Sequence, residues 1–269
     1  QFFGAAPARG EMYWRGPVRV DFAGPTWQQP RWLERMPAAP LTGTGQAFDY
    51  EIELEPTDTR QLVALDVPVG PPEGVRFGYD RGLYVDAPLG NVTRWRMRSV
   101  HAAAFEAELP SVLRAQALAL PRGYNPRTLA MGRAWRREAG TGAGSDRAIV
   151  ERALAMIRRD FAYTLQVPLA GRDEVDEFLF DRRQGYCEHF SSAFAVLMRA
   201  AGIPTRVVTG YAGGYRNPIG GYWLVLNSDA HAWNEAWLEG RGWVRVDPTA
   251  AVAPERVFDT IAERRPGRI

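Results

Sequence analysis

Cysteine and lysine are the residues that this sequence of 269 amino acids almost or entirely lacks. It contains one cysteine, and all 33 of its basic Lys and Arg residues are arginine. A single cysteine excludes an internal disulfide and any metal site built from several thiolates. Without lysine, the chain has no side-chain ammonium of its own that could accept an acyl group.

Strong charge and long apolar runs are also missing. The net charge is +2, which is too small to indicate nucleic-acid binding. No stretch approaches the about 20 consecutive apolar residues of a membrane-spanning helix, and the first residues lack a signal-peptide pattern. The sequence reads like a segment of a longer protein. Its content of 46% hydrophobic and 24% charged residues is typical of a globular protein.

Short alternating runs dominate the first half of the chain. Such runs occur at residues 50–55, 62–67, 82–86 and 95–100; Pro56 follows the first run and Pro68 the second. This spacing predicts an antiparallel β-rich module over residues 1–112. Its arginine stripe, at Arg94, Arg96 and Arg98, is interpreted as a solvated face, with a phosphate or anionic-glycan site as the alternative.

From residue 113 the pattern becomes helical and then returns to strands. Helices are predicted near residues 129–140 and 145–157, and strands at 206–211, 222–227, 231–238 and 243–247. We therefore predict an α+β fold in which residues 113–269 form a second, catalytic part. His101 lies in the first part, far along the chain from the cysteine, and is interpreted as structural.

The only cysteine, Cys187, is predicted to lie in the first turn of a helix. The apolar face of this helix is formed by Phe190, Phe194, Leu197 and Ala201. Gly202 occupies the C-cap position, and Pro204 prevents the helix from continuing. Free amides and the helix dipole stabilise a thiolate at Cys187, and a thiolate is a nucleophile. The alternative is a small buried thiol in a core helix.

A base and an acid follow the cysteine on two predicted strands. A glycine turn near Gly240 favours an antiparallel hairpin, which places His231 opposite or diagonal to Asp247. His231 is then predicted to take the thiol proton and later protonate the leaving amine, with Asp247 orienting the imidazole. His189 lies two residues beyond Cys187, about 200° around the helix, so it is neither the base nor part of a metal pair.

The oxyanion donor and the acyl site are less defined by the sequence. The backbone amide of Cys187 is the expected oxyanion donor. Gln184 is a candidate for a second donor from its side chain, with a solvated loop residue as the alternative. Trp233 shares the predicted strand face of His231, so it is a candidate to shield a thioester or line an acyl tunnel; a core position is the alternative.

Four blocks of the second half resemble signatures of the bacterial transglutaminase-like superfamily. They are residues 185–190, 202–211, 231–237 and 242–249. Residues 13–18 and 22–27 also resemble the periplasmic domain of the TgpA family, membrane-anchored transglutaminase proteins of Gram-negative bacteria. The resemblance implies a papain-like core and carries Cys187, His231 and Asp247 over as its triad. Asn234 stands where relatives often have a valine-like residue.

The resemblance implies a protein-glutamine gamma-glutamyltransferase. We predict no cofactor and no metal-ligating residues. Its partners would be a protein or peptide with a glutamine side chain and a primary amine, with no nucleic acid. Its location would be the periplasm, with membrane anchoring only through segments outside this sequence. Two alternatives share the fold: a cysteine peptidase or amidase acting on cell-wall or protein peptides, and a non-catalytic scaffold.

Overall fold

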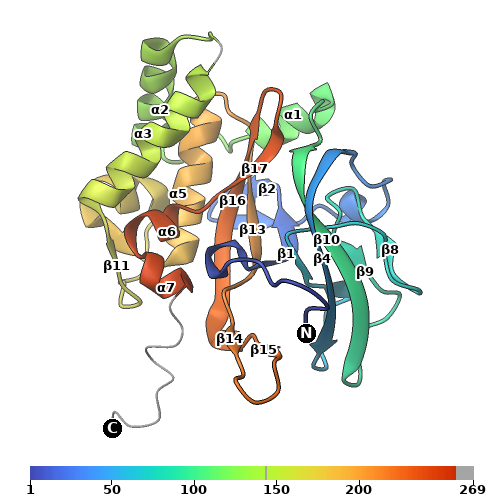
Figure 1. Ribbon diagram of the computed structural model, residues 1–269. Coiled ribbons are helices and arrows are strands. Elements are labelled where there is room, and N and C mark those ends of the chain that lie inside the picture. Colours follow the sequence, from blue (N-terminus) through green and yellow to red (C-terminus); the bar gives the residue numbers. More distant parts are fainter. Residues whose placement is uncertain (143, 259–269) are drawn as a thin grey trace, which may run out of the picture.

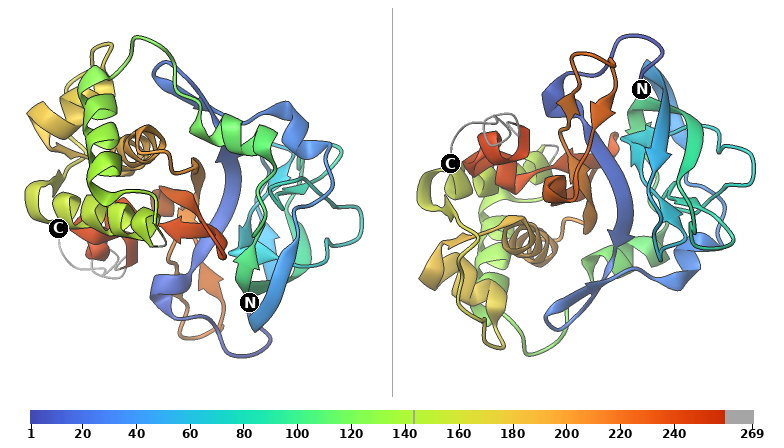
Figure 2. Two further views of the ribbon diagram at one scale, coloured as in Figure 1. Left: turned by 90° about the horizontal axis from the view of Figure 1, so that it is seen from above. Right: turned by 90° about the horizontal axis from the view of Figure 1, so that it is seen from below.

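The computed structural model describes residues 1–142 and 144–258 and shows an α+β protein with a curled sheet. Apart from α1, the helices lie on one side, the long strands β4 and β10 lie on the other, and β1, β13 and β16 stand between them (Figures 1 and 2). This arrangement confirms the predicted fold class. No helix in these two ranges is long and apolar enough to cross a membrane.

The strands supply most of the first half and the centre of the second. Their bounds are β1 Tyr13–Arg19, β2 Asp21–Ala23, β3 Thr26–Gln28, β4 Leu41–Leu54, β5 Gln61–Leu62, β6 Ala64–Leu65, β7 Val67–Pro68, β8 Arg76–Phe77, β9 Leu83–Tyr84, β10 Thr93–Phe105, β11 Ala162–Tyr163, β12 Gln184–Gly185, β13 Thr205–Ala212, β14 Tyr215–Arg216, β15 Trp223–Leu224, β16 Ala230–Leu238 and β17 Gly242–Val246.

The helices follow the β-rich region, with a few short turns elsewhere. They are α1 Ser111–Leu118, α2 Pro126–Ala139, α3 Ser145–Asp160, α4 Glu174–Asp176, α5 Cys187–Ala200, α6 Pro248–Val252 and α7 Pro254–Phe258. A π-helical turn, Glu177–Arg182, leads toward α5. A 3₁₀ turn, Asn227–Asp229, replaces the end of the strand predicted at 222–227, because Asp229 Oδ2 accepts the amide of Leu226 at 2.8 Å.

The main sheet mixes strands from both halves of the chain. Its order is β4-β10-β17-β16-β13-β1-β6, and β7 also pairs with β10. β6 ends this order, and it is separated by Asp66 alone from β7, which pairs with β10 next to the other end. The sheet therefore curls into a barrel-like ring that runs from β10 round to β7. The N-terminal strand β1 thus lies beside β13, and the boundary predicted at residues 112/113 stays a prediction.

A buried ion network fills part of the curled sheet. Glu235 accepts bonds from Arg15 Nε and from Arg206 Nε, both at 2.7 Å. All three side chains are buried. Two guanidiniums hold the pKa of Glu235 at about 2, against the upward effect of burial, which is the largest single influence. Since β1, β13 and β16 each contribute one member, the network fixes how these strands associate.

Helix α5 begins and ends where the sequence predicts. Tyr186 is its extended N-cap residue and Cys187 its first helical residue. After Ala201, Gly202 adopts a left-handed φ of 80°, which a residue with a side chain rarely does. Its apolar residues are buried against β13 and β16. Packing of this face holds α5, with Cys187 at its start, against β13 and β16.

Arg199 connects α5 to the first half of the chain. Its guanidinium donates to three backbone carbonyls, those of Val20 at 2.7 Å, Ala119 at 2.8 Å and Thr205 at 2.8 Å. The side chain is buried with no carboxylate partner among these contacts, and burial lowers its pKa to about 9. The buried guanidinium of Arg199 therefore connects α5 to the end of α1 and to the N-terminal strands.

We expect Arg199→Met to lower the free energy of unfolding by about 2–4 kcal/mol, because buried carbonyls would lose charged donors. Chemical denaturation measures the change. Arg147→Met is the matched control, since Arg147 is exposed and pairs with Glu151 one turn away at 2.8 Å. It should shift stability by no more than about 0.5 kcal/mol. Equal effects of the two changes would contradict the role given to Arg199.

The arginine stripe on β10 is a solvated face, as predicted. Arg94 pairs with Glu53 at 2.7 Å, Arg98 pairs with Asp49 at 2.8 Å, and all four side chains are more than half exposed. Their partners lie directly opposite on β4. Cross-strand ion pairs of this kind account for the stripe without an anionic ligand.

Candidate active site

The cysteine lies at the start of α5, where a loop is held by a short strand pair. β11 and β12 run parallel, with Ala162 opposite Gln184 and Tyr163 opposite Gly185. This pairing holds the two residues before the N-cap Tyr186 in an extended form. Cys187 is a free, half-buried thiol at the N-terminal end of the helix. The amides of the first turn and the positive end of the helix dipole therefore favour negative charge at this sulfur.

The structure brings His231 and Asp247 together with Cys187. In the β16–β17 pair Asn234 lies opposite Val246, which places His231 diagonally to Asp247, just past the end of β17. His231 Nε2 lies 2.8 Å from Asp247 Oδ2. The thiol of Cys187 lies near enough to the imidazole to help raise the pKa of His231. The three residues that the sequence selected therefore form one connected chain of side chains.

Charge and burial act in opposite directions on His231. Burial alone lowers its pKa, but the charge of Asp247 and hydrogen bonds with Asp247 and Cys187 raise it to about 10. The imidazole is therefore protonated at neutral pH. The imidazolium therefore places a positive charge beside the Cys187 sulfur at the N-terminal end of α5.

Asp247 is held as a carboxylate by several donors. Its Oδ1 caps α6 by accepting the amides of Thr249 at 2.9 Å and Ala250 at 3.1 Å. Its Oδ2 accepts the hydroxyl of Tyr13 at 2.7 Å and faces His231. Burial raises the pKa of Asp247, but His231 and these hydrogen bonds together keep it below the ordinary value. The carboxylate is thus fixed in position and charge.

Two polar residues that the sequence did not single out for this role dock the cysteine helix onto the histidine strand. Ser191 Oγ donates to the carbonyl of Ala232 at 2.8 Å, and Asn234 Nδ2 donates to the carbonyl of Ser191 at 3.0 Å. Both side chains are fully buried. These contacts fix the position of α5 along β16, and so the position of Cys187 relative to His231. The sequence signal was Asn234, which stands where relatives often have a valine-like residue.

His189 faces away from the thiol and supports the helix start. Its ring packs edge-to-face on Tyr186 with centroids 4.3 Å apart, and Nδ1 lies 3.5 Å from the amide of Tyr186. Burial, followed by the charge of Arg182, lowers the pKa of His189. Glu174 lies 3.6 Å from Nε2, a distance too long to outweigh these effects. His189 therefore acts as a neutral packing residue.

As the pH drops below about 6.5, the ordinary pKa of histidine, we expect the free energy of unfolding to decrease. The reason is that His189 takes up a proton more readily in the unfolded chain than in the folded protein. His189→Gln removes this titration, so its free energy of unfolding should fall less between pH 6.5 and 5. His231 has a raised pKa, and its contribution is fully present in this range and lost only at higher pH. Parallel pH curves for the two proteins would contradict the assignment.

The other two predicted site residues, Trp233 and Gln184, are not part of the arrangement of Cys187, His231 and Asp247. Trp233 is only 1% exposed and stacks on His231 with ring centroids 6.1 Å apart. Gln184 is exposed on β12. Contact of either residue with a substrate stays a prediction. His101 binds Asp66 through Nδ1 at 3.1 Å, consistent with its structural interpretation.

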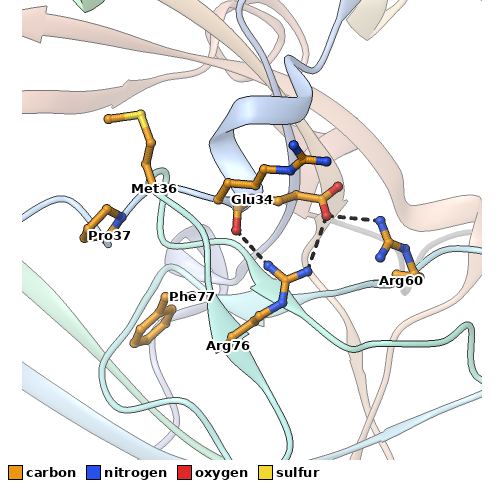
Figure 3. Close-up of a pocket in the computed structure, with 7 residues that line it drawn as sticks. Glu34, Met36, Pro37, Arg60, Arg76 and Phe77 are labelled. Atoms are coloured by element: carbon orange, nitrogen blue, oxygen red, sulfur yellow. Dashed lines mark hydrogen bonds and ion pairs between the residues drawn. The ribbon is translucent and has the colours of Figure 1, made fainter.

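Two surface cavities differ in their chemistry. One, of about 30 Å³, is lined by His231, Tyr163, Ser228 and Thr249 among others, and its volume suits water rather than a glutamine side chain. The other, of about 620 Å³, is lined by residues from the first half of the chain. Figure 3 shows Arg60 and Arg76 directed toward Glu34 in this larger cavity. Neither cysteine nor histidine lines it, so the nucleophile and base belong elsewhere.

A cysteine at a helix start, beside a histidine on an adjoining sheet, is typical of a papain-like or transglutaminase-like protein. Comparisons with known proteins agree. Residues 133–248 match the transglutaminase-like superfamily, and residues 2–106 match the TgpA N-terminal domain. The chain therefore belongs to the transglutaminase-like superfamily and, within it, to the TgpA family, as its sequence blocks predicted.

Individual relatives support this assignment over nearly the whole chain. A protein-glutamine gamma-glutamyltransferase of Pseudomonas aeruginosa is 39% identical over 259 residues, which are 96% of this chain. YebA of Bacillus subtilis is 46% identical over 87 residues. The crystal structure of the periplasmic domain of TgpA from Pseudomonas aeruginosa has a TM-score of 0.89 at 37% identity, covering 97% of this chain and 90% of that one.

The chain spans 38% of the length of the Pseudomonas transferase and 12% of YebA. It corresponds to the part of TgpA that lies in the periplasm, which confirms the predicted location.

Proposed function

We propose that this domain is a cysteine acyltransferase that acts on the carboxamide of a protein glutamine. The observation that carries the proposal is the connected arrangement of the Cys187 thiol, the His231 imidazolium and the buried Asp247 carboxylate. The Pseudomonas relative named as a protein-glutamine gamma-glutamyltransferase supports the substrate class. A protein glutamine is therefore the proposed acyl donor, and a primary amine the proposed acceptor.

The proposed reaction has two halves. The Cys187 thiolate attacks the carboxamide carbon, and the His231 imidazolium gives its proton to the departing nitrogen, which leaves as ammonia. A thioester and a neutral imidazole remain. The incoming amine then gives a proton to His231 as its nitrogen attacks the thioester carbon, and the thiolate leaves. The product is a substituted amide, and the ion pair of Cys187 and His231 is restored.

Each group has a defined task in this scheme. Asp247 stabilises the imidazolium in the resting and final states and keeps Nε2 directed toward itself, which leaves the other ring nitrogen for sulfur. The backbone amide of Cys187 is the proposed donor to the oxyanion, because helix amides at this position have no partner within the helix. Water in place of the amine would convert the reaction to deamidation.

Incorporation of a fluorescent primary amine into casein tests the proposal. We expect the wild-type domain to label casein and to release one ammonia for each amine incorporated. Ammonia release without labelling would show a deamidase, and release of shortened casein peptides would show a peptidase. Either result, or no turnover with casein and a panel of glutamine peptides, would contradict the acyltransferase.

A further inference from the structure

We propose that Tyr13, on the N-terminal strand β1, is a positioning residue for Asp247, so that both halves of the chain build the site. This inference rests on the proposed function for its kinetic consequence. It rests on the structure alone for its geometry, because the contact joins residues that are 234 positions apart.

The hydroxyl of Tyr13 and the imidazole of His231 share one oxygen of Asp247. Tyr13 Oη donates to Oδ2 at 2.7 Å, and His231 Nε2 lies 2.8 Å from the same atom. Tyr13 is only 3% exposed, so bulk water has little access to compete for that oxygen. A hydrogen bond to a charged, buried acceptor is among the stronger ones in proteins. The hydroxyl therefore restricts where the carboxylate can lie.

The tyrosine ring is itself fixed on several sides. Trp233 meets it edge-to-face with centroids 5.1 Å apart, and the Arg245 guanidinium lies 4.1 Å from its centroid. Backbone pairing of Tyr13 with Ala212 sets its height on the sheet. Because Trp233 also stacks on His231, one aromatic cluster aligns the tyrosine, the histidine and the carboxylate. A rigid ring gives the hydroxyl a single direction.

The contact also influences the charge of Asp247. The donated hydrogen bond helps to hold the pKa of Asp247 below its ordinary value, while burial and the carboxylate raise that of Tyr13, which therefore remains a donor. The other ionisable groups that act on this contact are His231 on β16, with Cys187 beside it, and Arg245 on β17. Without the Tyr13 hydroxyl, Asp247 becomes protonated at a higher pH. The His231 imidazolium then loses the charged carboxylate that stabilises it.

The test is Tyr13→Phe, which removes one oxygen atom and keeps the ring. Tyr50→Phe is the matched control, because Tyr50 is equally buried in the N-terminal strands and its hydroxyl bonds to Ser99 Oγ at 3.0 Å and the amide of Leu65 at 2.9 Å. Thermal unfolding shows that both variants are folded. Amine incorporation gives kcat and KM from pH 4 to 9 for each of them.

We expect Tyr13→Phe to lower kcat about 10- to 100-fold with KM unchanged, and to move the acid limb of the pH profile upward. Tyr50→Phe should alter stability and leave both parameters and the profile as in wild type. The rate of Cys187 alkylation by iodoacetamide, measured over the same pH range, should show the same upward shift. That readout needs no substrate, so it decides the role of Tyr13 even if the proposed transferase activity fails.

A double-mutant cycle separates positioning from a purely structural effect. In an Asp247→Asn background the carboxylate is gone, so adding Tyr13→Phe should cost much less than it does alone. Two results would overturn the inference: wild-type alkylation and kinetic profiles in folded Tyr13→Phe, or an equal loss with and without the Asp247 carboxylate.

Discussion

Cys187→Ala is expected to abolish amine incorporation, with a loss on the order of 10⁵- to 10⁶-fold, the scale seen when a protease nucleophile is removed. No other thiol exists in the chain to replace it. The fold should persist, because Cys187 is half-buried at the first position of α5, where alanine is favourable. Fluorescent-amine incorporation and ammonia release both measure the loss.

Glu188→Ala is the control for this change. Glu188 is the next residue of the same helix turn and is exposed, so its removal costs only a helix-dipole interaction of about 0.3–1 kcal/mol. Turnover by this variant should remain close to wild type. Residual incorporation by Cys187→Ala above the uncatalysed rate would place the nucleophile elsewhere and remove the basis of the proposed mechanism.

Asp247→Asn is expected to lower kcat by about 10⁴-fold, as for the corresponding change in a serine protease triad. An amide has no charge to stabilise the His231 imidazolium. If the NH₂ group of the asparagine took the place of Oδ2, it would face two other donors, the Tyr13 hydroxyl and the His231 Nε2. The α6 cap should survive, because an asparagine oxygen still accepts at Oδ1.

Asp176→Asn makes the same chemical change at a buried carboxylate outside the site. Asp176 accepts the amides of Arg127 at 2.9 Å and Thr128 at 2.8 Å at the start of α2. It should lower the melting temperature without changing kcat. A near-normal kcat in folded Asp247→Asn would show that another residue orients His231.

The local parts of the site could be predicted from the sequence. Glycine and proline after Ala201 mark the end of α5, and the apolar period behind Cys187 marks its packed face. The glycine turn between β16 and β17 fixes their pairing to within a diagonal step, which suffices to bring His231 near Asp247. These features depend on residues close together along the chain, where turn and helix rules apply directly.

The long-range parts could not be predicted in this way. Strands of two residues, such as β6 and β7, carry too little pattern to reveal that they close the sheet. The contact of Tyr13 with Asp247 depends on β1 inserting beside β13, and nothing local in either strand specifies that partner. Likewise, nothing in the sequence near Arg15 indicates that this arginine is buried in one network with Glu235 and Arg206.

Detection of an acyl-enzyme at Cys187 tests the central claim most directly. The domain is mixed with a glutamine peptide without an amine acceptor, quenched in acid within seconds and digested with trypsin. Because trypsin cleaves after Arg183 and Arg199, Cys187 falls in the fragment 184–199. The proposed mechanism predicts that this fragment gains the mass of the peptide minus one ammonia and loses it again on treatment with hydroxylamine. Turnover of the peptide with the label on another fragment, or with none on this one at any quench time, would contradict it.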